Sequence, residues 1–145
     1  STGSGPPTRH HPRSSLDTTS FFLGTAMGDE KIIIDPETGA RKGSKLARYD
    51  LVPPDALQAL AEHYGRGAEK YADRNWEAGY KWGLSFAALM RHAWAWWRGE
   101  DTDEETGSNH MAAVAWHAFA LATFQARWRG TDDRSVPGSP PCSSS

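Results

Sequence analysis

The sequence has only one cysteine, Cys142, which lies in a tail rich in serine and proline. A single cysteine excludes a disulfide framework and a cysteine-based zinc site within the chain. No apolar run approaches the roughly 20 residues that cross a membrane, and the segment SFFLGTAM is too short for a convincing signal peptide. These absences favour a protein of the cytoplasm that contacts no membrane.

The chain also lacks an excess of positive charge. Its 16 Lys and Arg against 18 Asp and Glu give a formal net charge of -2, whereas nucleic-acid binding depends on a basic surface. The motifs GxxxxGK[ST], GxGxxG and HExxH are absent, so the nucleotide and zinc classes that they mark have no local support. No His is followed by Asp, the pair that an HD-type triphosphohydrolase needs. We therefore expect no nucleic-acid partner.

The chain is unusually rich in tryptophan, of which it has seven. Each can bury a large apolar surface, so even a small helical domain can form a sufficient core. Stretches rich in Gly, Pro and Ser flank this part of the chain. We predict a disordered arm over residues 1–26, a single helical domain over residues 27–130 and a disordered tail over residues 131–145.

The first predicted helix begins after a proline pair. Pro53 and Pro54 favour a helix start, Asp55 complements the N-terminal dipole, and the helix continues to about Tyr71. Before it, residues 31–34 form a short β run, followed by a turn. The sequence allows this segment to be either a small hairpin or a strand that docks on the helices.

Two further helices are expected over residues 84–98 and from Ser108 or Asn109, as the cap, to residue 128. The first of these two helices is apolar almost all round, which is typical of a buried helix. A chain of 145 residues has little core to spare, so we predict an oligomer. The fold class is all-α, an antiparallel helical bundle with an irregular N-terminal segment.

The stretch RHAWAWWRGEDTDEETGSNH joins the second and third helices and permits two interpretations. Its acids could cap a helix and face solvent in a non-catalytic oligomeric binding module. They could also form the wall of a metal-dependent active site. Counting residues along antiparallel helices places Glu62, His92 and His117 near one level of the bundle, and His110 level with Glu100 and Asp101. Carboxylates with imidazoles can bind divalent ions, and Mg²⁺ or Mn²⁺ prefers the oxygen ligands.

Three segments of the chain resemble a known family. They are ARYDLVPPDALQALAEHYGRGAEKYADRNWEAG, LMRHAWAWWRGEDTDEETG and HMAAVAWHAFAL, within residues 42–124. Together they resemble the phage dATP/dGTP diphosphohydrolases, often called MazZ, which are grouped with the MazG-like all-α NTP pyrophosphohydrolases. The resemblance implies cleavage of a purine deoxynucleoside triphosphate, (d)GTP fitting best, to the monophosphate and pyrophosphate. In phages that replace adenine by 2-aminoadenine, this reaction supplies dGMP.

One departure from that family concerns the metal ligands. MazG-like enzymes carry them as ExxE and ExxD on two helices, and this chain lacks that quartet. Its Mg²⁺ or Mn²⁺ ligands must then come from other acids, for which we name Glu62, Glu69, Glu100 and Asp101. Glu62 and His92 are the predicted catalytic residues. Residues expected to bind the substrate are Lys45, Arg48, Lys70, Arg74, Asn75, Trp76, Arg91 and His110.

Overall fold

The computed structural model describes residue 2 and residues 30–135. Contacts divide the chain into two compact units, Ser1–Leu46 and Ala47–Ser145. The arm predicted over residues 1–26 lies, apart from residue 2, outside the described residues, as does most of the predicted tail. The single domain predicted over residues 27–130 spans the boundary between the two units.

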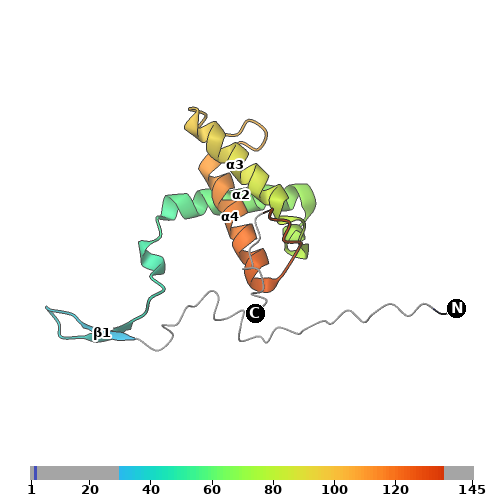
Figure 1. The fold of residues 1–145 in the computed structure, drawn as a ribbon. Helices are drawn as coiled ribbons and strands as arrows, with labels where there is room; N and C mark the ends of the chain where they lie inside the picture. The colour runs from blue at the N-terminus through green and yellow to red at the C-terminus, as the bar shows by residue number, and fades with distance from the viewer. Residues whose placement is uncertain (1, 3–29, 136–145) are drawn as a thin grey trace. The chain divides into compact units, whose positions relative to one another are not determined.

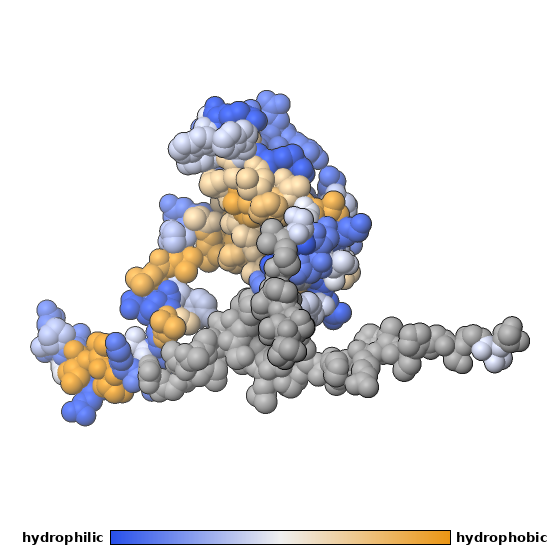
Figure 2. Space-filling model, in the orientation of Figure 1, coloured by the Kyte–Doolittle hydropathy of each residue, from blue (hydrophilic) through white to orange (hydrophobic). Residues whose placement is uncertain are grey.

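The first unit contains a two-stranded hairpin, as one of the two sequence alternatives predicted. Strand β1 (Lys31–Ile34) pairs antiparallel with β2 (Arg41–Ser44), with Lys31 opposite Ser44. The Asp35 carboxylate accepts hydrogen bonds from two backbone amides of the turn, and Gly39 has a φ of 75°, which a glycine adopts without steric cost. The three isoleucines of β1 are more than half exposed and form an apolar patch (Figure 2).

The second unit is helical, as predicted. Helix α2 (Pro54–Tyr71), helix α3 (Trp82–Trp97) and helix α4 (His110–Arg127) are its main elements (Figure 1). Two short 3-10 turns, η1 (Tyr49–Leu51) and η2 (Asn75–Ala78), precede α2 and α3. None of the described helices is long and apolar enough to cross a membrane.

Local signals set the helix starts as expected. Pro53 is the N-cap of α2 and Pro54 its first residue, where a missing backbone N–H costs nothing. Asp55 lies in the first turn, at the positive end of the helix dipole. Of the two predicted caps of α4, Asn109 is the one used: its Oδ1 accepts from the Met111 amide at 2.8 Å. The loop before it leaves Ser108 buried for another role.

Helix α4 is the centre of this unit, because it packs against both α2 and α3. The core consists of Trp82, Ala120 and Phe124, and partly buried aromatic side chains surround it. The short connections predict that each helix is the antiparallel neighbour of the next. The structure corrects this for α2, whose main partner is α4 and which crosses behind it in Figure 1.

Helix α3 exposes an apolar stripe, which we call the α3 outer stripe. Phe86, Met90, Trp94 and Trp97 follow one another at helical spacing, and between 47% and 72% of each is exposed. Large contiguous apolar surface of this kind marks an interaction site in soluble proteins. In this chain the helix that the sequence predicts to be buried all round is therefore covered on one side only.

Candidate active site

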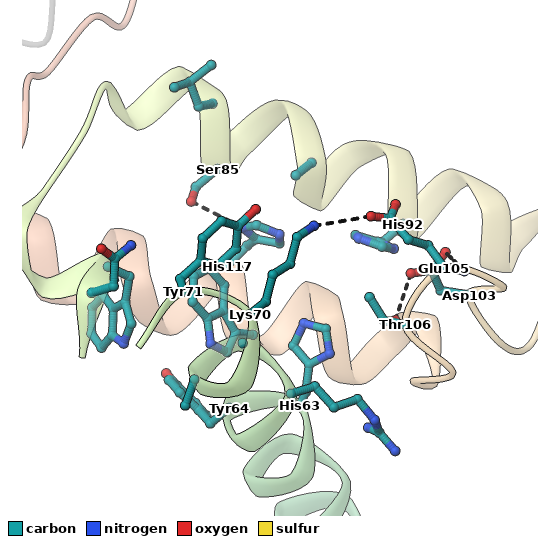
Figure 3. Close-up of a pocket in the computed structure, with 18 of the residues that line it drawn as sticks. His63, Tyr64, Lys70, Tyr71, Ser85, His92, Asp103, Glu105, Thr106 and His117 are labelled. Atoms are coloured by element: carbon teal, nitrogen blue, oxygen red, sulfur yellow. Dashed lines mark hydrogen bonds and ion pairs between the residues drawn. The ribbon is translucent and has the colours of Figure 1, made fainter. Parts of the chain in front are cut away.

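A pocket opens in the helical unit between α2, η2, α3, α4 and the loop that joins α3 to α4 (Figure 3). Four histidines line it: His63 from α2, His92 from α3, and His110 and His117 from α4. In Figure 3 the labelled rings of three of them point toward a common space. The described part of the chain thus brings together imidazoles from three helices that are distant in sequence.

The histidine rings contact one another directly. Nδ1 of His92 lies 2.9 Å from Nδ1 of His110, so one of the two nitrogens holds the proton and the other accepts it. The ring of His92 also stacks on that of His117 with centroids 6.0 Å apart. On its other side, Nδ1 of His117 lies 3.1 Å from the buried hydroxyl of Ser85, which is itself 2.6 Å from the Tyr80 hydroxyl.

Burial favours the neutral form of three of the pocket rings, those of His117, His92 and His63, near pH 7. It lowers the pKa of His117 to about 4, with the nearby His92, His63 and Arg91 adding to the effect. Burial likewise lowers the pKa of His92, against the opposing pull of Asp103, and that of His63. Neutral imidazoles carry one donor and one acceptor nitrogen each, so this wall of the pocket offers directional hydrogen bonds without net charge.

The acid-rich loop between α3 and α4 is folded around Asp103. Its carboxylate accepts from the Thr106 hydroxyl at 2.7 Å, and its backbone N–H donates to the Ser108 carbonyl at 2.8 Å. Burial alone would raise the pKa of Asp103, but hydrogen bonds to its carboxylate from the Thr106 hydroxyl and the Glu105 backbone N–H, with the facing His92 and His110, hold it below its ordinary value. Asp103 is therefore a charged group on the pocket wall.

An aromatic cage forms the other end of the pocket. The ring centroids of Tyr64, Trp76 and Trp116 lie 5.8 to 6.2 Å from one another, and Trp76 also contacts Phe124 of the core at 5.9 Å. Rings at these distances are in the range of favourable aromatic contacts. A flat apolar ligand group such as a nucleobase fits a surface of this kind.

Basic side chains surround the pocket mouth. Lys70, Arg74 and Arg91 all line it and are exposed. The Lys70 ammonium lies 3.4 Å from the carboxylate of Glu105 across the opening (Figure 3). Its pKa is raised by the hydrogen bond with Tyr71 and then by Glu105, so it is a cation at all physiological pH values. Such groups are suited to phosphate oxygens.

Comparison with known families identifies the chain. A family model described as "dATP/dGTP diphosphohydrolase, N-terminal" matches residues 36–134. The chain belongs to this diphosphohydrolase family. It is thus an enzyme of the nucleotide pyrophosphohydrolase class with a nucleotide substrate, as the resemblance implied, and not a non-catalytic binding module. A search of curated proteins and a search of solved structures each returned no match.

Most of the predicted site residues of this diphosphohydrolase do line the pocket. Those on its wall are Glu69, Lys70, Arg74, Asn75, Trp76, Arg91, His92 and His110. The others lie elsewhere. Arg48 is exposed and paired with Asp50, Lys45 belongs to the hairpin unit, and Glu100 and Asp101 are exposed beyond the pocket wall.

Residue counting predicts that Glu62 lies near His92 and His117. The structure does not place it there. The Glu62 side chain is 54% exposed and accepts a hydrogen bond from Gln58 at 3.1 Å on its own helix. Its neighbour His63 takes the predicted place, because the face of α2 that turns toward α4 is centred one residue later. The predicted level was right for His110, whose backbone N–H donates to the Asp101 carbonyl.

Several residues of the pocket region are not among the predicted site residues, and His63, Arg66 and Ser108 are three of them. Neither His63 nor Arg66 is a predicted site residue, and Ser108 is predicted only as a possible helix cap. In the structure Arg66 Nη1 donates to Ser108 Oγ at 2.8 Å. The sequence signal that could have revealed them is the i, i+3 spacing of His63 and Arg66 on one helical face.

The carboxylates expected to bind Mg²⁺ or Mn²⁺ are not gathered around one point. Within the part of the chain that the structure describes, no group of three or more His, Cys, Asp and Glu side chains is arranged to hold an ion. Of the expected ligands, only Glu69 lines the pocket. Mg²⁺ is usually held by one or two carboxylates together with substrate phosphates. The residues present fit an ion of that kind, and not an all-protein cage.

Proposed function

We propose that this chain hydrolyses a purine deoxynucleoside triphosphate between the α and β phosphates, with dGTP preferred and dATP also accepted. Water adds to phosphorus, the bond to the bridging oxygen breaks, and a monophosphate and pyrophosphate leave. One observation carries the proposal: a single pocket joins the aromatic cage, the histidine group and the basic mouth. An aromatic surface suits the base, and cations at the mouth suit the triphosphate.

His92 is the proposed general base. In this proposal Nδ1 of His92 donates to Nδ1 of His110 at 2.9 Å, which leaves Nε2 unprotonated to take the proton of the attacking water. Burial favours the neutral ring by lowering the pKa of His92, and a neutral ring near pH 7 is the form that can act as a base. His110 then serves to orient His92, in addition to its proposed contact with the substrate.

The substrate contacts follow from position along the pocket. Lys70, Arg74 and Arg91 would hold the triphosphate, because guanidinium and ammonium groups bind phosphate oxygens. Trp76 would stack on the base and Asn75, next to it in η2, would read the base edge through its amide. Lys45 and Arg48 remain proposed as an additional basic rim.

We further propose that catalysis requires Mg²⁺ or Mn²⁺. When bound with the triphosphate, such an ion neutralises phosphate oxygens and acidifies a bound water. Glu69 is the pocket carboxylate that would help to hold it. Glu62, Glu100 and Asp101, which lie outside the pocket wall of a single chain, were the other expected ligands.

The proposal includes a homo-oligomer. The α3 outer stripe leaves large aromatic side chains in solvent in one chain, and a second copy would cover them. The proposed setting is the cytoplasm of a host cell, where dGMP from this reaction supplies the synthesis of 2-aminoadenine nucleotides of a phage.

The test incubates the protein with each NTP and dNTP plus Mg²⁺ or Mn²⁺ and separates the nucleotide and phosphate products. The expected result is dGMP with pyrophosphate from dGTP, and no turnover in EDTA. A matched variant, His92→Phe, should retain nucleotide binding and lose turnover by at least about 100-fold, the usual contribution of a general base. Release of intact inorganic triphosphate, or turnover that chelation leaves unchanged, contradicts the mechanism.

A further inference from the structure

A second buried hydroxyl, that of Ser108, links two pocket residues to which the proposed reaction gives no role. Ser108 is 2% exposed. Its Oγ lies 2.8 Å from Nη1 of Arg66 and 2.7 Å from Nδ1 of His63. The three side chains come from α2 and from the end of the acid-rich loop, so they are brought together only by the fold.

The direction of these hydrogen bonds follows from the chemistry of the groups. A guanidinium has donors and no acceptor, so the Ser108 oxygen accepts from Arg66. The hydroxyl has one proton of its own, and among the described residues His63 Nδ1 is the acceptor that the structure places within reach. A buried hydroxyl that donates to nothing is costly. Ser108 therefore donates to Nδ1, and the single proton of the neutral His63 ring resides on Nε2.

The ring of His63 is held in place on its other side as well. It meets Trp116 edge to face, with centroids 6.2 Å apart and planes at 76°. Nε2 lies at the tip of an imidazole, away from Cβ, and the ring of His63 points into the pocket (Figure 3). Arg66 and Lys70, from the next turns of the same helix, line the same wall. An N–H among these groups faces the place where an anion would bind.

We propose that Arg66 and Ser108 are positioning residues that fix His63 as its Nε2–H form, and that His63 thereby donates a hydrogen bond to a phosphate oxygen of the nucleotide. The first half stands on the hydrogen-bond geometry alone. The second half rests on the proposed function. A fixed donor of this kind requires no reorganisation when the substrate arrives, which is the advantage of a preorganised site.

The first half is tested by NMR on the full chain with ¹⁵N-labelled imidazole rings, without nucleotide. The expected spectrum shows His63 with a protonated Nε2 and an unprotonated, hydrogen-bonded Nδ1. In Ser108→Ala, the Nδ1 resonance should move to the position of an unbonded ring nitrogen, and Ser108→Thr, which keeps the hydroxyl, should restore it. The matched control is Ser85→Ala, which removes the buried hydroxyl beside His117 and should leave both His63 nitrogens unchanged.

The second half is tested by turnover of dGTP. His63→Gln keeps an N–H near the Nε2 position, whereas His63→Phe removes it. We expect His63→Phe to lower kcat/KM by about 10- to 100-fold, the effect of one hydrogen bond to a charged oxygen, and His63→Gln to recover most of that loss.

Each outcome decides one of the two halves. A proton on Nδ1 of His63, or an Nδ1 resonance that Ser108→Ala leaves in place, overturns the assignment of positioning residues. Should Ser108→Ala not fold, Ser108→Gly gives the same readout, since it also removes the hydroxyl that contacts Nδ1. Equal kcat/KM for His63→Phe and the wild type overturns the phosphate contact. Complete inactivity of the wild-type protein toward all nucleotides refutes the proposed function and leaves the NMR result standing.

Discussion

Lowering the pH should destabilise this protein through the ring of His117. Burial, with the charges of His92, His63 and Arg91, lowers the pKa of His117 from 6.5 to about 4 in the folded chain. Between these two values the unfolded chain binds a proton that the folded chain does not. The contribution of the neutral ring to stability is thus fully present above about pH 6.5 and is lost as the pH falls toward about 4.

The size of the effect follows from the difference between the two pKa values. A shift from 6.5 to about 4 corresponds to roughly 3 kcal/mol of free energy of unfolding. Solvent screens the ring in part, since it is only partly buried, so about 1 to 2 kcal/mol is the expected change. This is a large fraction of the stability of a small domain.

The assay is urea denaturation of the wild type and of His117→Asn at a series of pH values from about 7.5 to about 4.5. Asparagine keeps a polar group near Ser85 but cannot titrate in this range. The stability of the wild type relative to the variant should fall by about 1 to 2 kcal/mol across the series. As the control, Ser85→Ala keeps the titrating ring and should shift stability by a similar amount at every pH. A difference between wild type and His117→Asn that stays constant with pH would refute the reasoning.

Three further predictions concern the metal ligand, the contact with the nucleobase and the oligomeric state. Glu69→Gln should lower turnover by about 10- to 100-fold. Glu62→Gln, at a side chain that the structure places in solvent, should change turnover by no more than about 2-fold. Steady-state kinetics in Mn²⁺ compares the two variants, and a larger loss in Glu62→Gln than in Glu69→Gln would restore Glu62 to the site. Trp76→Ala should raise KM for dGTP by about 10-fold through loss of stacking, with kcat less affected; an unchanged KM would place the base elsewhere. Light scattering should show an oligomer that Phe86→Glu combined with Trp97→Glu converts to monomers, and a wild type that is monomeric at micromolar concentration with a cooperative melt would contradict this.

The parts of the fold that the sequence predicts well depend on neighbouring residues. A proline pair begins α2 and an asparagine caps α4, because the groups that satisfy a helix end lie within a few positions of it. Local pairing also explains the hairpin. The packing partner of α2 could not be predicted in this way. Its hydrogen bonds with Ser108, in the loop just before α4, join residues 45 and 42 positions apart, and periodicity does not tell which helix an apolar stripe will meet.

The candidate site shows the same division between local and long-range information. His92, Trp76 and Lys70 were found from the sequence because each lies in a distinctive short segment. Residue counting places Glu62 level with His92, and a carboxylate suits a metal ion, so Glu62 is the predicted residue and its neighbour His63 is not among the candidates. Adjacent residues on a helix differ by about 100° in direction, so an error of one residue exchanges a solvent-facing side chain for a pocket one. Only a long-range contact, here with Ser108, distinguishes them.

The histidine group has a consequence for how this pocket would bind a polyanion. Carboxylates on its inner wall would repel a triphosphate unless ions neutralised them. Four imidazoles line that wall beside the carboxylates of Asp103, Glu105 and Glu69, and the burial that lowers the pKa of His117, His92 and His63 favours the neutral form of those three rings. The imidazoles therefore supply hydrogen-bond donors without adding negative charge, and Lys70, Arg74 and Arg91 at the mouth would balance the phosphates. In the proposed reaction, an Mg²⁺ or Mn²⁺ bound with the triphosphate would offset the carboxylates that share the wall with these rings.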